Sequence, residues 1–228
     1  MYKDRRMDID AFRGVAIVLM IIFHLTFDLE FLRIVHFNFE DLWLVLFQRV
    51  VGTMFLLLVG ISLILSEKKN NEGYKRHLKR AVKLGAVALL ISIATWIVAP
   101  EEFIKFGVIH CIAVSTLMAP LFFRFKWLNL ILGIILIITG ISIHYTEIDY
   151  LFWLGWITHT YTALDHYPLI PWFGIVLIGL FLGKVMPEFK VKNKLTESLT
   201  YLGRNSLLIY VIHQPLIISL LLLLFYLR

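Results

Sequence analysis

Seven long apolar stretches dominate the sequence and limit the folds that are open to it. Each is long enough to cross about 30 Å of hydrocarbon as a helix. The runs are nearly continuous and lack the alternation of barrel strands, so they predict a polytopic, all-α membrane bundle. The predicted spans are Phe12–Phe31, Leu42–Leu65, Ala81–Val98, Phe106–Phe123, Trp127–Ile143, Leu169–Met186 and Ser206–Leu227.

The composition supports a membrane protein. Of the 228 residues, 60% are hydrophobic and 17% are charged, and the mean hydropathy is +0.83. Soluble domains average about half apolar and about a quarter charged residues. The single cysteine, Cys111, excludes an internal disulfide framework. The basic amino terminus resembles a signal peptide, but no small-residue cleavage site follows, so we expect a retained first helix in one domain covering 1–228.

The distribution of lysine and arginine predicts the orientation. With a cytoplasmic amino terminus, four of these residues precede or begin the first span, seven lie between 68 and 83, two are Arg124 and Lys126, and five lie between 184 and 204. Arg33, Lys105 and Arg228 fall on the other side. Cytoplasmic loops carry the excess of positive charge, so we expect the amino terminus inside, the carboxyl terminus outside and a multi-pass plasma-membrane protein.

The basic cytoplasmic face has two interpretations. Topology and attraction to anionic lipids explain it without any further function. A docking surface for a polyanionic cofactor is the alternative, although charge alone favours the first interpretation. We expect no nucleic-acid partner. The predicted outer loop, Tyr145–Tyr167, has no lysine or arginine and carries Glu147, Asp149 and Asp165. Its segment Leu151–Ile157 is too short to span and is predicted to be interfacial or re-entrant.

The first span concentrates ionisable side chains, each of which is costly in a membrane. Arg13 and His24 are eleven residues apart, which places them on one helix face and roughly 16 Å apart along the axis. Asp10 precedes Arg13 by three residues and Asp28 follows His24 by four, so each lies beside its neighbour. The four side chains therefore form a polar stripe along one sector of the helix.

This polar stripe suggests a division of labour. Arg13 at the cytoplasmic edge suits a phosphate group, because its guanidinium is planar and permanently charged. His24 lies deeper, where the reactive end of a long, thin cofactor would reach it, and Asp28 is expected to orient its imidazole. The structural alternative is that Asp10 and Arg13 form an ion pair at the helix start and that His24 is a buried polar contact.

Two further histidines are predicted at membrane depth. His110 lies near the outer end of the fourth span, and His213 lies within the seventh, just before Pro215. Each is expected either to line the cavity that His24 faces or to hold helices together. No His-x₃-His pair or carboxylate cluster accompanies them, so we expect no metal.

Several motifs in order resemble the heparan-α-glucosaminide N-acetyltransferase catalytic-domain family and, more broadly, the transmembrane acyltransferase superfamily. They cover essentially the whole chain. The resemblance rests on Met7–Gly14 with His24, Gly52–Leu56, Val59–Ser62, Phe106–His110, Tyr167–Trp172, Leu202–Leu207 and His213–Pro215.

The resemblance implies an acetyl-CoA-dependent enzyme that moves an acyl group across a membrane to an acceptor, commonly a sugar. Arg13 would serve the cofactor end and His24 the reaction centre. Family members with a larger catalytic domain have more helices than the seven predicted here. In the animal enzymes the essential histidine follows the first span in the outer loop, and His36 is the nearest match. Whether His24 or His36 is the chemical histidine therefore stays open, and we favour His24.

The resulting hypothesis is acyl transfer from acetyl-CoA. His24 would act as a general base or carry the acetyl group in a ping-pong route. Expected partners are acyl-CoA, a glycan or amine acceptor and membrane lipids. The sequence leaves open whether the protein forms a homo-oligomer, although seven helices are few for a closed cavity. Candidate catalytic residues are His24, Asp28 and His36, candidate cofactor contacts are Arg13, Asp10, Lys79, Arg80, Arg204, His110 and His213, and candidate oxyanion donors are Ser62, Asn205 and Gln214.

Two other function classes compete with acyl transfer. A proton-coupled transporter would use His24, Asp28, His110 and His213 as a relay. The absence of inverted repeats and of paired broken helices argues against it. The other class is a non-catalytic membrane scaffold, which would not bind acyl-CoA.

Overall fold

Helices joined by turns make up the described part of the chain. The computed structural model describes residues 6–38, 41–67, 73–143, 145–146, 148–189 and 193–225, and within these ranges it contains no β-strand. The helices are α1 (Met7–Phe31), α2 (Leu42–Glu67), α3 (Gly73–Val98), α4 (Val108–Met118), α5 (Trp127–Ser142), α6 (Leu169–Val185), α7 (Lys194–Arg204) and α8 (Ser206–Phe225), with short 3₁₀ helices at Ala119–Phe122 and Asp149–Leu151. Of the charged residues used above, Lys3, Arg5, Lys68, Lys69, Glu147, Lys190, Lys192 and Arg228 lie outside the described residues, as does the side chain of Asp149.

Each of the seven predicted stretches contains a helix within the described residues, and the structure adds one helix that hydropathy does not predict. α3 begins at Gly73, well before the expected start, and the fourth stretch is α4 followed by a 3₁₀ turn. The additional helix is α7, whose sequence is polar on one face. The Asn193 side chain caps it by accepting a hydrogen bond from the Thr196 amide at 2.7 Å. Because α7 has low hydropathy and a basic residue at each end, its sequence is typical of a cytoplasmic loop.

The apolar surface of the helices requires a lipid environment. α1, α2, α3 and α8 are long and apolar enough to cross a membrane, whereas α4 with its 3₁₀ turn, α5 and α6 are shorter apolar helices. Only 17% of the most apolar window of α3, and the same share in α8, is buried. Large exposed apolar surface is unfavourable in water. The chain is therefore an integral membrane protein, while the number of crossings stays a prediction.

The chain divides into two compact units. The first comprises Met1–Phe55 and Pro187–Arg228, and the second comprises Leu56–Met186. The first unit thus holds α1, the beginning of α2, α7 and α8. A single catalytic domain over the whole chain stays a prediction.

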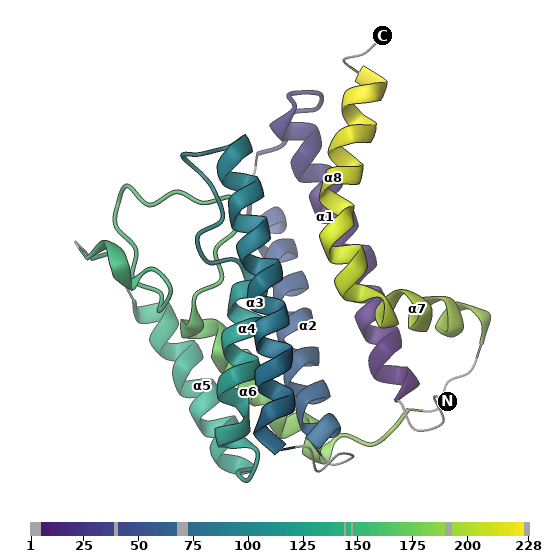
Figure 1. Ribbon diagram of the computed structural model, residues 1–228, viewed down its shortest axis with the longest axis vertical. Coiled ribbons are helices and arrows are strands. Elements are labelled where there is room, and N and C mark those ends of the chain that lie inside the picture. The colour runs from purple at the N-terminus through teal and green to yellow at the C-terminus, as the bar shows by residue number, and fades with distance from the viewer. Residues whose placement is uncertain are drawn as a thin grey trace. The chain divides into compact units, whose positions relative to one another are not determined.

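The first unit is built on α1. Ile17 and Met20 of α1 are buried with Val51 of α2, and Ile209 and Tyr210 of α8 pack against this cluster. α7 lies across the direction of α8 (Figure 1) and packs on the amino-terminal part of α1.

Two glycines allow α1 and α7 to approach closely. A Cβ atom on Gly14 would overlap the backbone carbonyl of Leu199, and one on Gly203 would overlap the carbonyl of Asp10. Small residues at such crossings let backbones meet. The α1–α7 contact therefore depends on both positions staying glycine.

The second unit also has glycines where the backbones of two helices meet. Gly60 of α2 meets Gly179 of α6, and Gly133 of α5 meets Gly174 of α6. The glycines predicted as packing positions in these helices thus lie at backbone contacts. α3 and α4 pack on each other in the same unit.

Replacing Gly14 with alanine tests the α1–α7 contact. We expect Gly14→Ala to destabilise the protein by about 1–3 kcal/mol, because the added methyl meets backbone that has no flexible end to move. The measurement is the thermal midpoint of the purified protein in detergent.

Gly85→Ala is the matched control, since a Cβ on Gly85 of α3 meets nothing within 4 Å. Alanine is the better helix former by up to about 1 kcal/mol, so this variant should unfold at the same or a higher temperature. Equal midpoints for the two variants would contradict the close approach.

Candidate active site on the first unit

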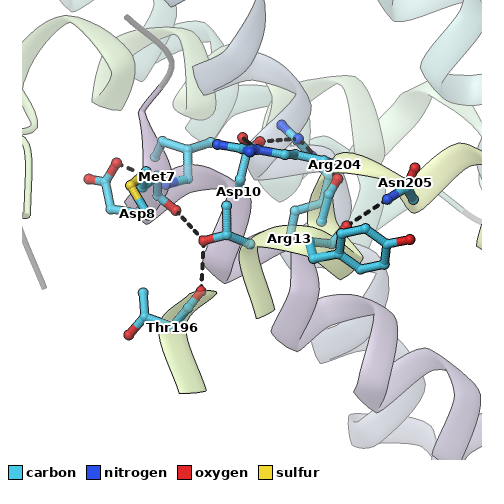
Figure 2. A network of polar contacts seen from close by, with 11 residues as sticks. Met7, Asp8, Asp10, Arg13, Thr196, Arg204 and Asn205 are labelled. Carbon is cyan, nitrogen blue, oxygen red and sulfur yellow. Dashed lines mark hydrogen bonds and ion pairs between the residues drawn. The ribbon is translucent and has the colours of Figure 1, made fainter. Parts of the chain in front are cut away.

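A buried acid organises the amino-terminal end of the polar stripe. Asp10 is only 2% exposed, and its carboxylate accepts a hydrogen bond from Arg13 Nη1 at 2.8 Å. Arg204 at the end of α7 forms an ion pair with the same carboxylate, Nε to Oδ2 at 3.6 Å (Figure 2). Arg13 Nη1 also lies 3.4 Å from the Gly203 carbonyl oxygen. The predicted neighbour relation of Asp10 and Arg13 is thus formed, and α7 adds a second arginine.

Further hydrogen bonds tie α7 and the preceding segment to the start of α1. Thr200 Oγ1 donates to the Thr196 carbonyl at 2.7 Å and lies 3.4 Å from the Met7 carbonyl oxygen (Figure 2). Asp8 pairs with Arg6 and accepts a hydrogen bond from the Phe189 amide at 3.0 Å. The hydrogen bond to Asp8 raises the pKa of Arg6. These contacts fix where Arg204 lies relative to α1.

The charges at this end favour an anion. One buried carboxylate faces two guanidinium groups, whereas Arg6 and Asp8 balance each other. The Arg204 side chain is 34% exposed and that of Arg13 is 16% exposed. Arg204 is therefore the more accessible of the two cations for a phosphate group.

The other end of the polar stripe is a cluster of four polar side chains from α1 and α8, which we call the histidine cluster: His24, Asp28, His213 and Gln214. The rings of His24 and His213 have centroids 4.8 Å apart. Gln214 Nε2 donates to Asp28 Oδ1 at 2.6 Å. Asp28 is fully buried at 0% exposure. The cluster lies within the first unit, in helices that are apolar overall.

Four buried atoms of the histidine cluster have no hydrogen-bond partner among the described residues. They are His24 Nδ1, His213 Nε2, Asp28 Oδ2 and Gln214 Oε1. Buried polar atoms in native proteins are nearly always paired, and an unpaired one costs about 1–3 kcal/mol. Several such atoms in one place indicate a site for a polar ligand or water. The orienting hydrogen bond from Asp28 to His24 that the sequence suggested is not formed, because Asp28 Oδ1 accepts from Gln214 and neither Asp28 Oδ2 nor His24 Nδ1 has a partner among the described residues.

His36 occupies a different environment. Its side chain is 89% exposed on the turn after α1, and Nδ1 lies 3.2 Å from Glu30 Oε1. Together with Arg33 and Val35 these residues line a shallow depression. His36 is therefore open to solvent, whereas the unpartnered atoms of the histidine cluster are buried.

His110 caps a helix in the second unit. Its Nδ1 accepts a hydrogen bond from the Gly107 amide at 3.2 Å, and its Nε2 lies 3.2 Å from Ser92 Oγ, which donates to the Ile104 carbonyl. Both ring nitrogens thus have partners, which supports a structural role. Lys79 and Arg80, the other predicted cofactor contacts in this unit, are exposed on α3.

Asp165 also accepts a hydrogen bond from the start of α4. Its Oδ2 accepts a hydrogen bond from the Val108 amide at 2.9 Å. Burial raises the pKa of Asp165 to about 6. The next residue, His166, accepts or donates a bond with the Tyr161 hydroxyl at 3.0 Å, and burial lowers the pKa of its ring to about 4. This part of the predicted outer loop is therefore packed and partly desolvated.

One family model matches the chain. It is described as heparan-alpha-glucosaminide N-acetyltransferase, catalytic, and it matches residues 5–215. This range contains both ends of the polar stripe, α7 and α8 as far as Pro215. The chain belongs to this family. Membership makes it a membrane acetyltransferase and confirms the resemblance drawn from its motifs. No curated protein and no solved structure matches the chain.

Sequence reasoning found most of the side chains that this acetyltransferase-family member brings together. It placed Arg13 beside Asp10 and named Arg204 and His213 as candidates. It did not find the Gln214–Asp28 hydrogen bond or the direct neighbourhood of His24 and His213. The signal available was His213-Gln214, two polar residues inside an apolar span that need partners on another helix.

Asp165 and His166 should oppose each other in the pH dependence of stability. The raised pKa of Asp165 gives stability that is present below its unfolded value, near 3.8, and is lost as pH rises through about 6. The lowered pKa of His166 gives stability that is present above 6.5 and is lost as pH falls through about 4. Between pH 4 and 6 the two contributions partly cancel.

Single substitutions separate the contribution of Asp165 to the pH dependence of stability from that of His166. Asn and Gln keep acceptor groups for Val108 and Tyr161 but do not titrate. We expect the thermal midpoint of Asp165→Asn to rise more steeply from pH 4 to pH 6 than that of the wild type, and that of His166→Gln to rise less or fall. Midpoints that run parallel to the wild type in both variants would contradict these environments.

Proposed function

We propose that the protein transfers an acetyl group from cytoplasmic acetyl-CoA to a hydroxyl or amine acceptor, a sugar, on the outer side of the plasma membrane. The observation that carries the proposal is the polar stripe on α1. An accessible cationic group lies at one end, and the buried histidine cluster lies at the other, roughly 16 Å away along the helix. The family supplies the reaction class.

The proposed topology follows from the charges. Seven crossings, with a cytoplasmic amino terminus, place Arg13, Arg204, Lys79 and Arg80 on the cytoplasmic side. The donor's phosphates would then bind at Arg204 and Arg13, where Asp10 holds both guanidinium groups in place. Lys79 and Arg80 are proposed as further anion contacts on that side. The outer half of α1 carries His24.

His24 would act as the general base in a direct transfer. It takes the proton from the acceptor hydroxyl or amine as that oxygen or nitrogen attacks the thioester carbonyl carbon. The carbon–sulfur bond then breaks, and the leaving thiolate recovers the proton from His24. Gln214 is a candidate to stabilise the negative oxygen that forms meanwhile, because its amide group lies in the same cluster.

Replacing His24 tests the catalytic proposal. We expect His24→Ala to slow thiol release from acetyl-CoA by about 10²–10⁴-fold, the usual contribution of a general base. The assay measures thiol release by purified protein with a panel of sugar and amine acceptors.

His159→Gln is the control, because His159 is exposed in the outer loop and stacks on Tyr145. Wild type and His24→Ala releasing thiol at equal rates would overturn the proposal. A loss of activity in His36→Gln, with His24→Ala fully active, would move the chemistry to the exposed turn. Proteoliposome uptake of a substrate without thiol release would favour a transporter.

Replacing Arg204 tests donor binding. We expect Arg204→Gln to raise the KM for acetyl-CoA about fivefold with little change in kcat, since a partly exposed charged contact contributes roughly 1 kcal/mol.

Lys194→Gln is the matched control at the opposite end of α7, where the side chain is also exposed. An equal rise of the KM for acetyl-CoA in both variants would show an effect of basic charge in general and would contradict a specific role for Arg204.

A further inference from the structure

His213 has the features of a residue that acts through His24. We propose that His213 fixes the tautomer of His24, so that His24 Nδ1 carries the hydrogen and its Nε2 is left as the basic atom. This deepens the proposed function, on which its kinetic part rests. His213 would be a positioning residue, the role that the sequence suggested for Asp28.

The tautomer of His213 follows from its hydrogen bond. His213 Nδ1 lies 2.6 Å from the backbone carbonyl oxygen of Tyr210. A carbonyl oxygen only accepts hydrogen bonds, so Nδ1 must be the protonated nitrogen. In the neutral ring, Nε2 then carries a lone pair. This nitrogen is buried and has no partner among the described residues.

The neighbouring ring offers the complementary atom. His24 Nδ1 is also buried without a partner in the described part of the chain, and the two ring centroids are 4.8 Å apart. The two nitrogens are not hydrogen-bonded as the rings stand, but if His24 Nδ1 carries the hydrogen, a rotation of the rings about their side-chain bonds lets it donate directly to His213 Nε2. The other tautomer would bury a lone pair on each of these nitrogens with no hydrogen to share between them, at a cost. The pair therefore favours hydrogen on His24 Nδ1.

A second contact holds the two rings in register. Gln214 directly follows His213 and donates to Asp28 Oδ1 at 2.6 Å, four residues beyond His24 on α1. This bond sets the rotation of α8 against α1 at the level of the rings. Asp28 Oδ1 accepts from Gln214, and Asp28 Oδ2 makes no hydrogen bond to His24, so we assign the orienting role to His213.

The chemical consequence is a chain of three groups. The Tyr210 carbonyl accepts from His213 Nδ1, and in the proposed arrangement His213 Nε2 accepts from His24 Nδ1. When His24 Nε2 takes the acceptor's proton, the positive charge forms on a ring whose other nitrogen already donates to a neutral base. The proton returns from Nε2 to the thiolate when the carbon–sulfur bond breaks, so no net proton is consumed.

The tautomer is measurable without any enzyme assay. The experiment is solid-state NMR of ¹⁵N-histidine-labelled full-length protein in lipid bilayers, with the His24 signals identified by their loss in His24→Ala. We expect His24 to be protonated at Nδ1 in the wild type and at Nε2 in His213→Ala. An Nε2-protonated His24 in the wild type, or an unchanged tautomer in His213→Ala, would overturn the proposal. Because this readout needs no turnover, it decides the proposal even if acetyl transfer is not observed.

A double-mutant cycle gives the kinetic test. We expect His213→Ala to lower kcat at least about 100-fold, because a wrong tautomer removes the base, with the KM for acetyl-CoA unchanged. Added to His24→Ala, it should have no further effect. A multiplicative further loss would show an independent role and overturn the proposal. His213→Gln keeps a polar side chain of similar length and serves as the second variant if His213→Ala does not fold, with His159→Gln as the matched control.

Discussion

The first unit depends on one buried carboxylate. Asp10 is almost completely enclosed and is held between Arg13 of α1 and Arg204 of α7. A buried charge is tolerated only when it is paired, so this acid requires α7 to pack where Arg204 reaches it. Gly14 and Gly203 make that approach possible, because any larger side chain would meet backbone. Charge pairing and close packing thus fix the same contact.

The same helix carries both ends of the proposed chemistry. Because α1 is a continuous helix from Met7 to Phe31, the spacing between Arg13 and His24 is set by helix geometry alone. α7 completes the cationic end and α8 completes the buried end. A long donor molecule held at its phosphates would therefore meet a base at a fixed depth, which is what transfer across a membrane needs.

Satisfied and unsatisfied polar atoms distinguish His110 from the two histidines to which we assign a function. His110 is half-buried, both of its nitrogens have partners, and it closes the start of α4. His24 and His213 each keep one buried nitrogen without a partner among the described residues. Buried atoms of this kind need a partner, so they point to a bound water, a polar ligand or the proposed proton transfer.

The sequence by itself determined the seven apolar helices, because hydrophobic runs of that length have few other stable environments. It also determined the polar stripe on α1, since the helical period places Asp10, Arg13, His24 and Asp28 on one face, and its motifs identified the family. Only the tertiary structure decided which helices share these residues. It shows α7, whose Arg204 forms an ion pair with Asp10. It also shows that His213 lies beside His24 and that Asp28 accepts a hydrogen bond from Gln214. The reason is physical: periodicity fixes neighbours along one helix, whereas neighbours on different helices depend on how their surfaces pack.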